Sequence, residues 1–168
     1  MRRLLALFAA FAALPAGHAH AATDTLWATI NVCDTAAAPN SMGVRASMPG
    51  NGTGERMYMR FTAWWYSRNV ADWFPVRGKG RSPWIYVGRA RHRAHQGGWT
   101  FSFGQPTGDE FVVRGKVQFK WRKRVRRKRG KGDRWKVVER RHATTRSGIG
   151  NVGGGDPPGR SDGLCVIR

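Results

Sequence analysis

Apolar and polar residues alternate along residues 111–121, and this period of two restricts the fold more than any other feature of the chain. Successive side chains of a β-strand point to opposite faces, so one face here is apolar and the other is mostly basic. The apolar face comprises Phe111, Val113, Gly115, Val117, Phe119 and Trp121, and the other comprises Val112, Arg114, Lys116, Gln118 and Lys120. Such a strand is buried on one side only. We expect Phe119 and Trp121 to be buried and Lys116 and Lys120 to be exposed.

The same alternation recurs in residues 26–32, 57–65 and 99–103, whereas no stretch shows a sustained helical period that ends in good caps. The side chains assigned to the buried faces include Met57, Met59, Phe61, Ala63, Trp65, Trp99, Phe101 and Phe103. Weaker strand candidates are residues 42–48, 84–87, 135–141 and 164–167, separated by Gly- and Pro-rich turns. About seven to nine short strands of this kind predict an all-β fold, an antiparallel β-sandwich of the immunoglobulin-like type. A small closed β-barrel is the alternative.

The first 21 residues have the organisation of a secretory signal peptide. Arg2 and Arg3 form a positive segment, residues 4–14 are an apolar run, and small residues at Ala19 and Ala21 mark a cleavage site. The run is too short for a permanent transmembrane anchor. We therefore predict a secreted, extracellular protein in which residues 22–168 form a single β-sandwich domain.

Cys33 and Cys165 are the two cysteines of the chain, and both follow the predicted leader. An even number of cysteines in an oxidising compartment favours a disulfide bond. Two buried free thiols are the competing interpretation. The predicted bridge joins the start of the domain to its end.

Several short motifs resemble those of a group of uncharacterised secreted bacterial proteins with an immunoglobulin-like or fibronectin-like β-sandwich. They are NVCDT at 31–35, MGVRASMPGNG at 42–52, RMYMRF at 56–61, IYVG at 85–88 and CVIR at 165–168. The resemblance implies the fold and the export route, and it carries no functional residues. It departs from antibody-type domains, which bridge two central strands, because these cysteines lie near the two chain ends.

Positive charge is concentrated in one part of the chain. Without Arg2 and Arg3, 28 of the 30 Lys and Arg residues remain against 10 acidic ones, which gives a net charge of +18. Residues 122–133 lie between two strand candidates and are predicted to form a basic hairpin arm. Its cations are Arg122, Lys123, Arg124, Arg126, Arg127, Lys128, Arg129 and Lys131.

Arginine binds phosphate and sulfate through two parallel hydrogen bonds, so a dense run of one sign predicts contact with polyanions. The predicted partner is nucleic acid or an anionic cell-surface polymer, bound without sequence specificity. A solvated basic surface with no binding role is the competing interpretation.

Tryptophan suggests a second function, that of a carbohydrate-binding module. Trp64, Trp73, Trp84 and Trp135 lie outside the strongest apolar faces, and exposed indoles at Trp64, Trp73 or Trp84 could stack on sugars. A second layer of core packing explains these side chains equally well.

The sequence suggests no enzyme, metal or cofactor. The G-x-S-x-G pattern at residues 159–163 follows a Gly- and Pro-rich loop near the chain end, where the strand and helix of a hydrolase elbow have no room. His92 and His95 are flanked by Arg91 and Arg93, which disfavour a bound metal ion. We therefore expect a non-enzymatic binding protein.

Overall fold

The computed structural model describes residues 26–105, 110–126 and 132–168, which form strands and no α-helix. The strands are β1 (Trp27–Thr35), β2 (Ala38–Pro49), β3 (Arg56–Ser67), β4 (Asp72–Pro75), β5 (Ile85–Arg89), β6 (Ala94–Ser102), β7 (Phe111–Arg126), β8 (Asp133–Thr144) and β9 (Cys165–Ile167), with a short 3₁₀ turn, η1 (Gly78–Gly80), after β4. The predicted signal peptide, residues 1–21, lies outside the described part. Within that part, no helix has the length and apolar character needed to cross a membrane.

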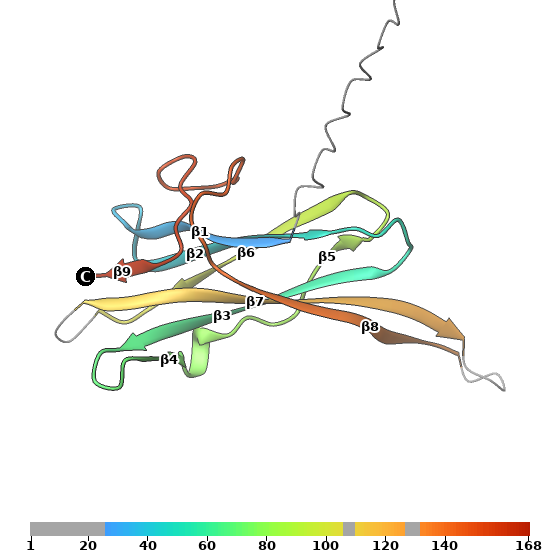
Figure 1. Ribbon diagram of the computed structural model, residues 1–168, viewed down its shortest axis with the longest axis horizontal. Coiled ribbons are helices and arrows are strands. Elements are labelled where there is room, and N and C mark those ends of the chain that lie inside the picture. Colours follow the sequence, from blue (N-terminus) through green and yellow to red (C-terminus); the bar gives the residue numbers. More distant parts are fainter. Residues whose placement is uncertain (1–25, 106–109, 127–131) are drawn as a thin grey trace, which may run out of the picture.

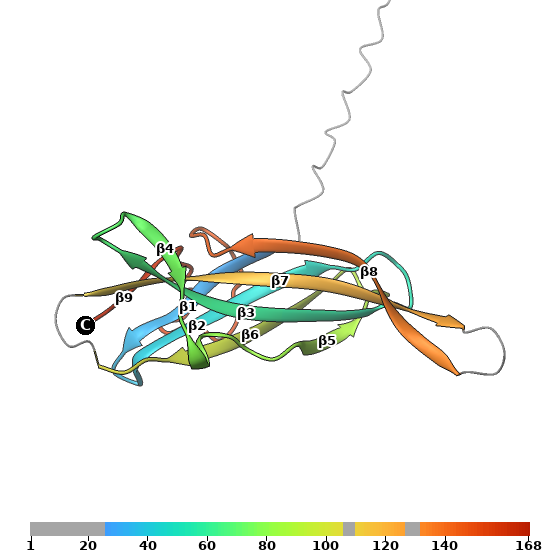
Figure 2. The same ribbon diagram turned by 90° about the horizontal axis from the view of Figure 1, so that it is seen from below.

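The strands form two antiparallel sheets that pack face to face, as Figures 1 and 2 show. The small sheet has the order β1-β2-β6, and the large sheet has the order β4-β3-β7-β8. Strand β5 also pairs with β3, and β9 pairs with the first residues of β7. The prediction of an all-β sandwich is confirmed, with β3 and β7 at the centre of the large sheet.

The core lies between the two sheets and is built from alternate residues of the central strands. Strands β3 and β7 pair so that Met59 lies opposite Phe119 and Met57 lies opposite Trp121. All four side chains are at most 1% exposed. The predicted inward faces of residues 57–63 and 113–121 are therefore confirmed, and Trp65 packs at the margin of the core.

Gly115 interrupts the apolar face of β7 because the two sheets approach closely there. A Cβ atom at this position would lie 2.8 Å from a methyl carbon of Val44 on the small sheet and 2.8 Å from the methyl carbon of Thr145. Any larger residue would force one of these neighbours to move. This glycine therefore sets the spacing of the sheets beside β2.

Trp99 is a correction to the predicted core. It lies on β6, which is the edge strand of the small sheet, and it is 36% exposed. Phe101, two residues further along β6 and on the same face, is 2% exposed. The predicted inward face of β6 is therefore correct, but other side chains cover Trp99 only in part. An edge strand has a neighbour on one side only, and a large ring there extends past the layer that buries smaller residues.

Two further differences concern short strands. Strand β4 was not predicted, because its four residues include Asp72 and Pro75 and are too few to show alternation. The last strand begins at Cys165 rather than Leu164, and Leu164 is 51% exposed. In both cases pairing with a long neighbour, β3 or β7, creates the strand.

The segment after β8 covers β1, which is why polar residues of β1 are buried. Asn31 donates hydrogen bonds to the carbonyl groups of Gly153 and Gly154, at 3.2 and 2.7 Å. The hydroxyl of Thr29 lies 2.8 Å from that of Ser161. Both residues are at most 7% exposed, because a glycine-rich segment can lie flat against the strand and satisfy its polar groups.

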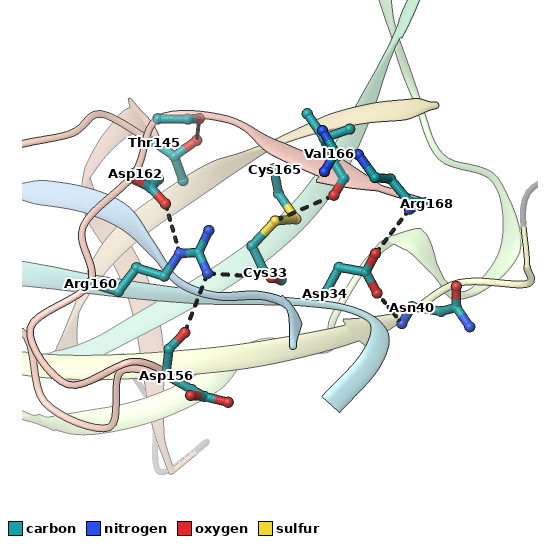
Figure 3. Close-up of a disulfide and its surroundings, with 11 residues drawn as sticks. Cys33, Asp34, Asn40, Thr145, Asp156, Arg160, Asp162, Cys165, Val166 and Arg168 are labelled. Atoms are coloured by element: carbon teal, nitrogen blue, oxygen red, sulfur yellow. Dashed lines mark hydrogen bonds and ion pairs between the residues drawn. A yellow bond between two sulfur atoms is a disulfide. The ribbon is translucent and has the colours of Figure 1, made fainter. Parts of the chain in front are cut away.

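Cys33 and Cys165 form the predicted disulfide, which joins β1 to β9 (Figure 3). Arg160 lies beside it and donates to a carboxylate oxygen of Asp162 at 2.7 Å and to the carbonyl of Cys33 at 3.4 Å. On the other side, the backbone N–H of Arg168 donates to the Asp34 carboxylate at 2.9 Å. The two ends of the described fold are thus held by a covalent bond and by charged contacts around it.

We predict that Phe119→Ala lowers the free energy of unfolding by about 3–5 kcal/mol, because it opens a cavity between the sheets. The measurement is denaturant unfolding followed by tryptophan fluorescence. Lys123→Ala, a change of an exposed residue on the same strand, is the control and should shift stability by no more than about 0.5 kcal/mol. Equal effects of the two substitutions would contradict the assignment of Phe119 to the core.

We also predict that replacing both cysteines with serine destabilises the protein by roughly 2–5 kcal/mol. The bridge closes a loop with a sequence separation of 132 residues, and losing it frees the unfolded chain. Unfolding midpoints of the oxidised protein, the reduced protein and the double variant provide the test. The reduced protein and the variant should agree, and a variant as stable as the oxidised protein would refute the expected role of the bridge.

Candidate functional site

The outward side of the large sheet carries a series of cations interleaved with aromatic rings. Because β3 and β7 are paired in register, Tyr58 lies opposite Lys120, Thr62 opposite Lys116 and Trp64 opposite Arg114. Rings from the neighbouring strands extend the series on both sides. We call this surface the cation–aromatic face, with the cations Arg56, Arg60, Arg114, Lys116, Lys120 and Arg122 and the rings Tyr58, Trp64, Trp73, Trp84, Tyr86 and Trp135.

Each cation of this face lies over at least one ring at cation–π distance. The Lys116 ammonium is 3.6 Å from the centre of the Trp64 ring, and that of Lys120 is 3.6 Å from the centre of Trp84. The guanidinium of Arg60 also lies over Trp84, at 4.3 Å. The pairs Arg114–Trp73 and Arg56–Trp135 have distances of 4.0 and 4.2 Å.

The expected exposure of Lys116 and Lys120 is therefore wrong, since both side chains are half-buried. Each lies over an indole, which removes water from one side of the amine. Burial lowers the pKa of Lys120 from its ordinary value, and the positive charges of Arg122, Arg60 and Arg140 lower it further. Burial likewise lowers the pKa of Lys116, with Arg114 acting in the same direction and Asp72 opposing it.

Carboxylates do not neutralise this surface. Five ion pairs occur among the described residues, and none includes a cation of the cation–aromatic face. Asp72 acts on Arg114 and Lys116 through space but forms no ion pair with either. The Nε atoms of Arg114 and Arg122 are buried without a hydrogen-bond partner. The positive charge of the face therefore remains available to an anion from solution.

Strands β7 and β8, on either side of the predicted basic arm, pair antiparallel as far as Arg126 and Asp133. This pair of strands extends beyond the rest of the sandwich at one end (Figures 1 and 2). Lys123, Arg124 and Arg126 are exposed, and Arg124 forms an ion pair with Asp133 at 2.6 Å. Arg122 is half-buried and donates to the carbonyl of Trp135 at 3.1 Å, so it belongs to the cation–aromatic face. The remaining arm cations, Arg127, Lys128, Arg129 and Lys131, lie outside the described residues.

Two adjoining hollows lie on this side of the large sheet. The larger, of about 660 Å³, has Thr62, Trp64 and Lys116 on the sheet, with the segment from Pro75 to Arg81 along one side. The smaller, of about 300 Å³, includes Arg60, Trp84 and Arg140. Gln118 and His142 line both hollows. We refer to the two together as the outer groove.

The indoles proposed for sugar binding are half-buried, and each has a cation over its ring. Trp64 carries Lys116, Trp73 carries Arg114, and Trp84 carries Lys120 and Arg60. The aromatic and basic residues thus form one surface, although the sequence suggested two separate sites. Sequence reasoning missed Arg60, Arg114, Lys116 and Lys120 as site residues, even though their alternation on strands was visible, because local patterns do not show which rings they meet.

The remaining motifs have structural partners. The hydroxyl of Ser161, within the G-x-S-x-G pattern, accepts from the backbone N–H of Ile149 at 2.8 Å and lies against Thr29, and no helix follows it in the described chain. His95 contacts the carbonyl of Arg89 at 2.8 Å, and its ring packs against His92. Within the described ranges, no group of three or more His, Cys, Asp or Glu residues lies close enough to hold a metal ion.

Comparisons with protein-family models and with curated proteins give no match for this chain. The candidate site therefore depends on its geometry and charge.

We predict that Lys116 and Lys120 lose their protons at a lower pH than an ordinary lysine. Burial and like charge both favour the neutral amine, so the shift is downward for each. The measurement is an NMR titration of lysine side-chain resonances, assigned with Lys116→Arg and Lys120→Arg. Titration of both lysines at or above the ordinary value would contradict the prediction that burial and like charge dominate there.

Proposed function

We propose that this protein is a non-enzymatic binding protein that acts outside the cytoplasm and holds polyanions on the cation–aromatic face and the basic arm. The observation that carries the proposal is the choice of partners on this face, where cations pair with rings and not with carboxylates. A carboxylate would cancel the positive charge. A ring holds the cation in place through its quadrupole and leaves the net charge unchanged.

Like charge on this face opposes folding, and a bound anion relieves that cost. Lys120 lies within the electrostatic influence of Arg60, Arg122 and Arg140, and these repulsions weaken the compact state. An anion that contacts several of these groups offsets the repulsion between them. This arrangement favours a ligand that carries many negative charges over one that carries a single charge.

The arm extends the same charge outward. Its exposed cations, Lys123, Arg124 and Arg126, continue along β7 from Lys120 and Arg122. Arginine accounts for five of the eight arm cations, which suits bidentate contact with phosphate or sulfate. The disulfide and the predicted leader support an extracellular setting, in which nucleic acid and anionic cell-surface polymers are the available polyanions.

We predict that affinity for duplex DNA or a sulfated polysaccharide falls linearly with the logarithm of salt concentration. Each phosphate contact on duplex DNA contributes a slope of about −0.9. Replacing Arg124, Arg126, Arg127 and Arg129 with serine should flatten the slope by up to about 3.6, since four contacts are lost. The measurement is a binding titration at several salt concentrations.

The matched control removes the same number of charges elsewhere, at the exposed residues Arg68, Arg93, Arg146 and Arg168. It should leave the slope close to that of the unaltered protein. Equal slopes for the arm variant and the control would show that the arm is not a contact surface. If the unaltered protein bound no polyanion at low salt, the proposed function would be wrong and the charge would serve solubility.

A further inference from the structure

The outer groove combines three features that a purely electrostatic surface does not need. It has cations along its length, an indole in each hollow, and apolar side chains in the larger hollow. In that hollow, Trp64, Pro75 and Val76 lie close to Lys116 and Arg81. A ligand that fills this space has both negative charge and flat apolar surface.

We propose that the outer groove binds a single strand of nucleic acid, with unpaired bases against Trp64 and Trp84 and phosphates at Lys116, Arg60 and Arg140. This inference rests on the proposed function and specifies the polyanion. Proteins that bind single strands combine a positive groove with aromatic side chains on which bases stack, and the outer groove has both.

The chemistry of the groove distinguishes a single strand from other polyanions. In a duplex the base faces are stacked on one another, so the indoles would have no base face to meet. A polyphosphate has charge but no flat apolar ring to place beside Pro75 and Val76. An unpaired nucleotide brings a phosphate and a base together in one unit.

Gln118 supplies a polar contact at the junction of the two hollows. Its side-chain oxygen accepts two hydrogen bonds from Arg60, at 3.1 and 2.8 Å. These bonds fix the orientation of the amide, and because Gln118 lines both hollows its nitrogen can donate to a ligand in the groove. The carbonyl oxygens and ring nitrogens of bases are acceptors for such a donor, and every base has at least one. The expected recognition therefore has little sequence preference.

Trp64 lies on β3 and Trp84 lies in the segment just before β5, and the β7 cations that lie over them give the distance over which the nucleic-acid strand must extend. Outward side chains recur every two residues, or about 6.7 Å, along β7. Lys116 and Lys120, which lie over Trp64 and Trp84, are thus separated by about 13 Å along the strand. The groove accordingly accommodates a short segment, with one base in each hollow.

The test compares four labelled probes by fluorescence anisotropy at fixed salt. They are a single-stranded oligonucleotide of about ten nucleotides, its duplex, an abasic strand of equal length, and a sulfated polysaccharide. Each stacked base contributes a factor of roughly 5 to 150, so the single strand should bind more tightly than the abasic strand by at least that factor. The ratio should persist as salt is raised, because stacking does not depend on counterion release.

Three variants locate the bases. Trp64→Leu should reduce the preference for the single strand over the abasic strand by a similar factor, while Trp64→Phe, which retains a flat ring, should keep most of it. Trp99→Leu is the control, because Trp99 is exposed on the small sheet and lies outside the groove. Thermal unfolding of each variant shows whether the fold is retained. The comparison of the four probes on the unaltered protein does not require that the variants fold.

The outcomes separate this inference from the proposed function. Equal binding of the single strand, the duplex and the abasic strand overturns the inference and leaves polyanion binding intact. A preference for the single strand that Trp64→Leu and Trp99→Leu reduce equally overturns the placement of bases in the groove. Absence of binding to all four probes overturns the inference and the proposed function together.

Discussion

The pairing of β3 with β7 is the constraint on which the rest of the structure depends. It places Met59 beside Phe119 on the inner side of the large sheet and Trp64 beside Arg114 on the outer side. Because side chains alternate, one register determines both faces, and a slip of one residue would expose the core and bury the cations. The hydrophobic contacts between the sheets therefore also determine the arrangement of the cation–aromatic face. Folding and site geometry share one set of backbone hydrogen bonds.

On the outer side of the large sheet, aromatic rings cover the surface of the sheet and leave its positive charge unneutralised. Lysine and arginine stems pack on apolar surface while their charged ends meet the indoles. Half-burial and mutual repulsion lower the pKa of Lys116 and of Lys120, and acidic side chains that would counter this form no ion pair there. Strand β8 is an edge strand of the large sheet, and its basic residues oppose pairing of this edge with another chain.

The first and last strands are joined near the end of the sandwich that lies away from the far end of β7 and β8 (Figure 1). Strand β1 is covered by the segment after β8, which returns to β7 as β9, and the disulfide joins the two strands. Arg160 and the carboxylates of Asp34 and Asp162 surround this junction (Figure 3). Asp34 and Asp162 thus form hydrogen bonds near the disulfide, whereas no acidic residue in the described part of the chain forms an ion pair with a cation of the cation–aromatic face. This separation of charge leaves one side of the large sheet positive.

The fold class, the inner faces of β3 and β7 and the Cys33–Cys165 disulfide could be predicted from the sequence. These features follow from a local period of two, from composition and from a pair of cysteines, all of which can be seen without distant contacts. The contacts of Trp64 with Lys116 and of Trp84 with Lys120, and the outer groove itself, depend on tertiary packing. Tertiary packing also decided that β4 forms and that Trp99 remains exposed. The physical reason is that alternation tells which face a residue occupies, whereas its neighbours on that face depend on the register between strands far apart in the chain.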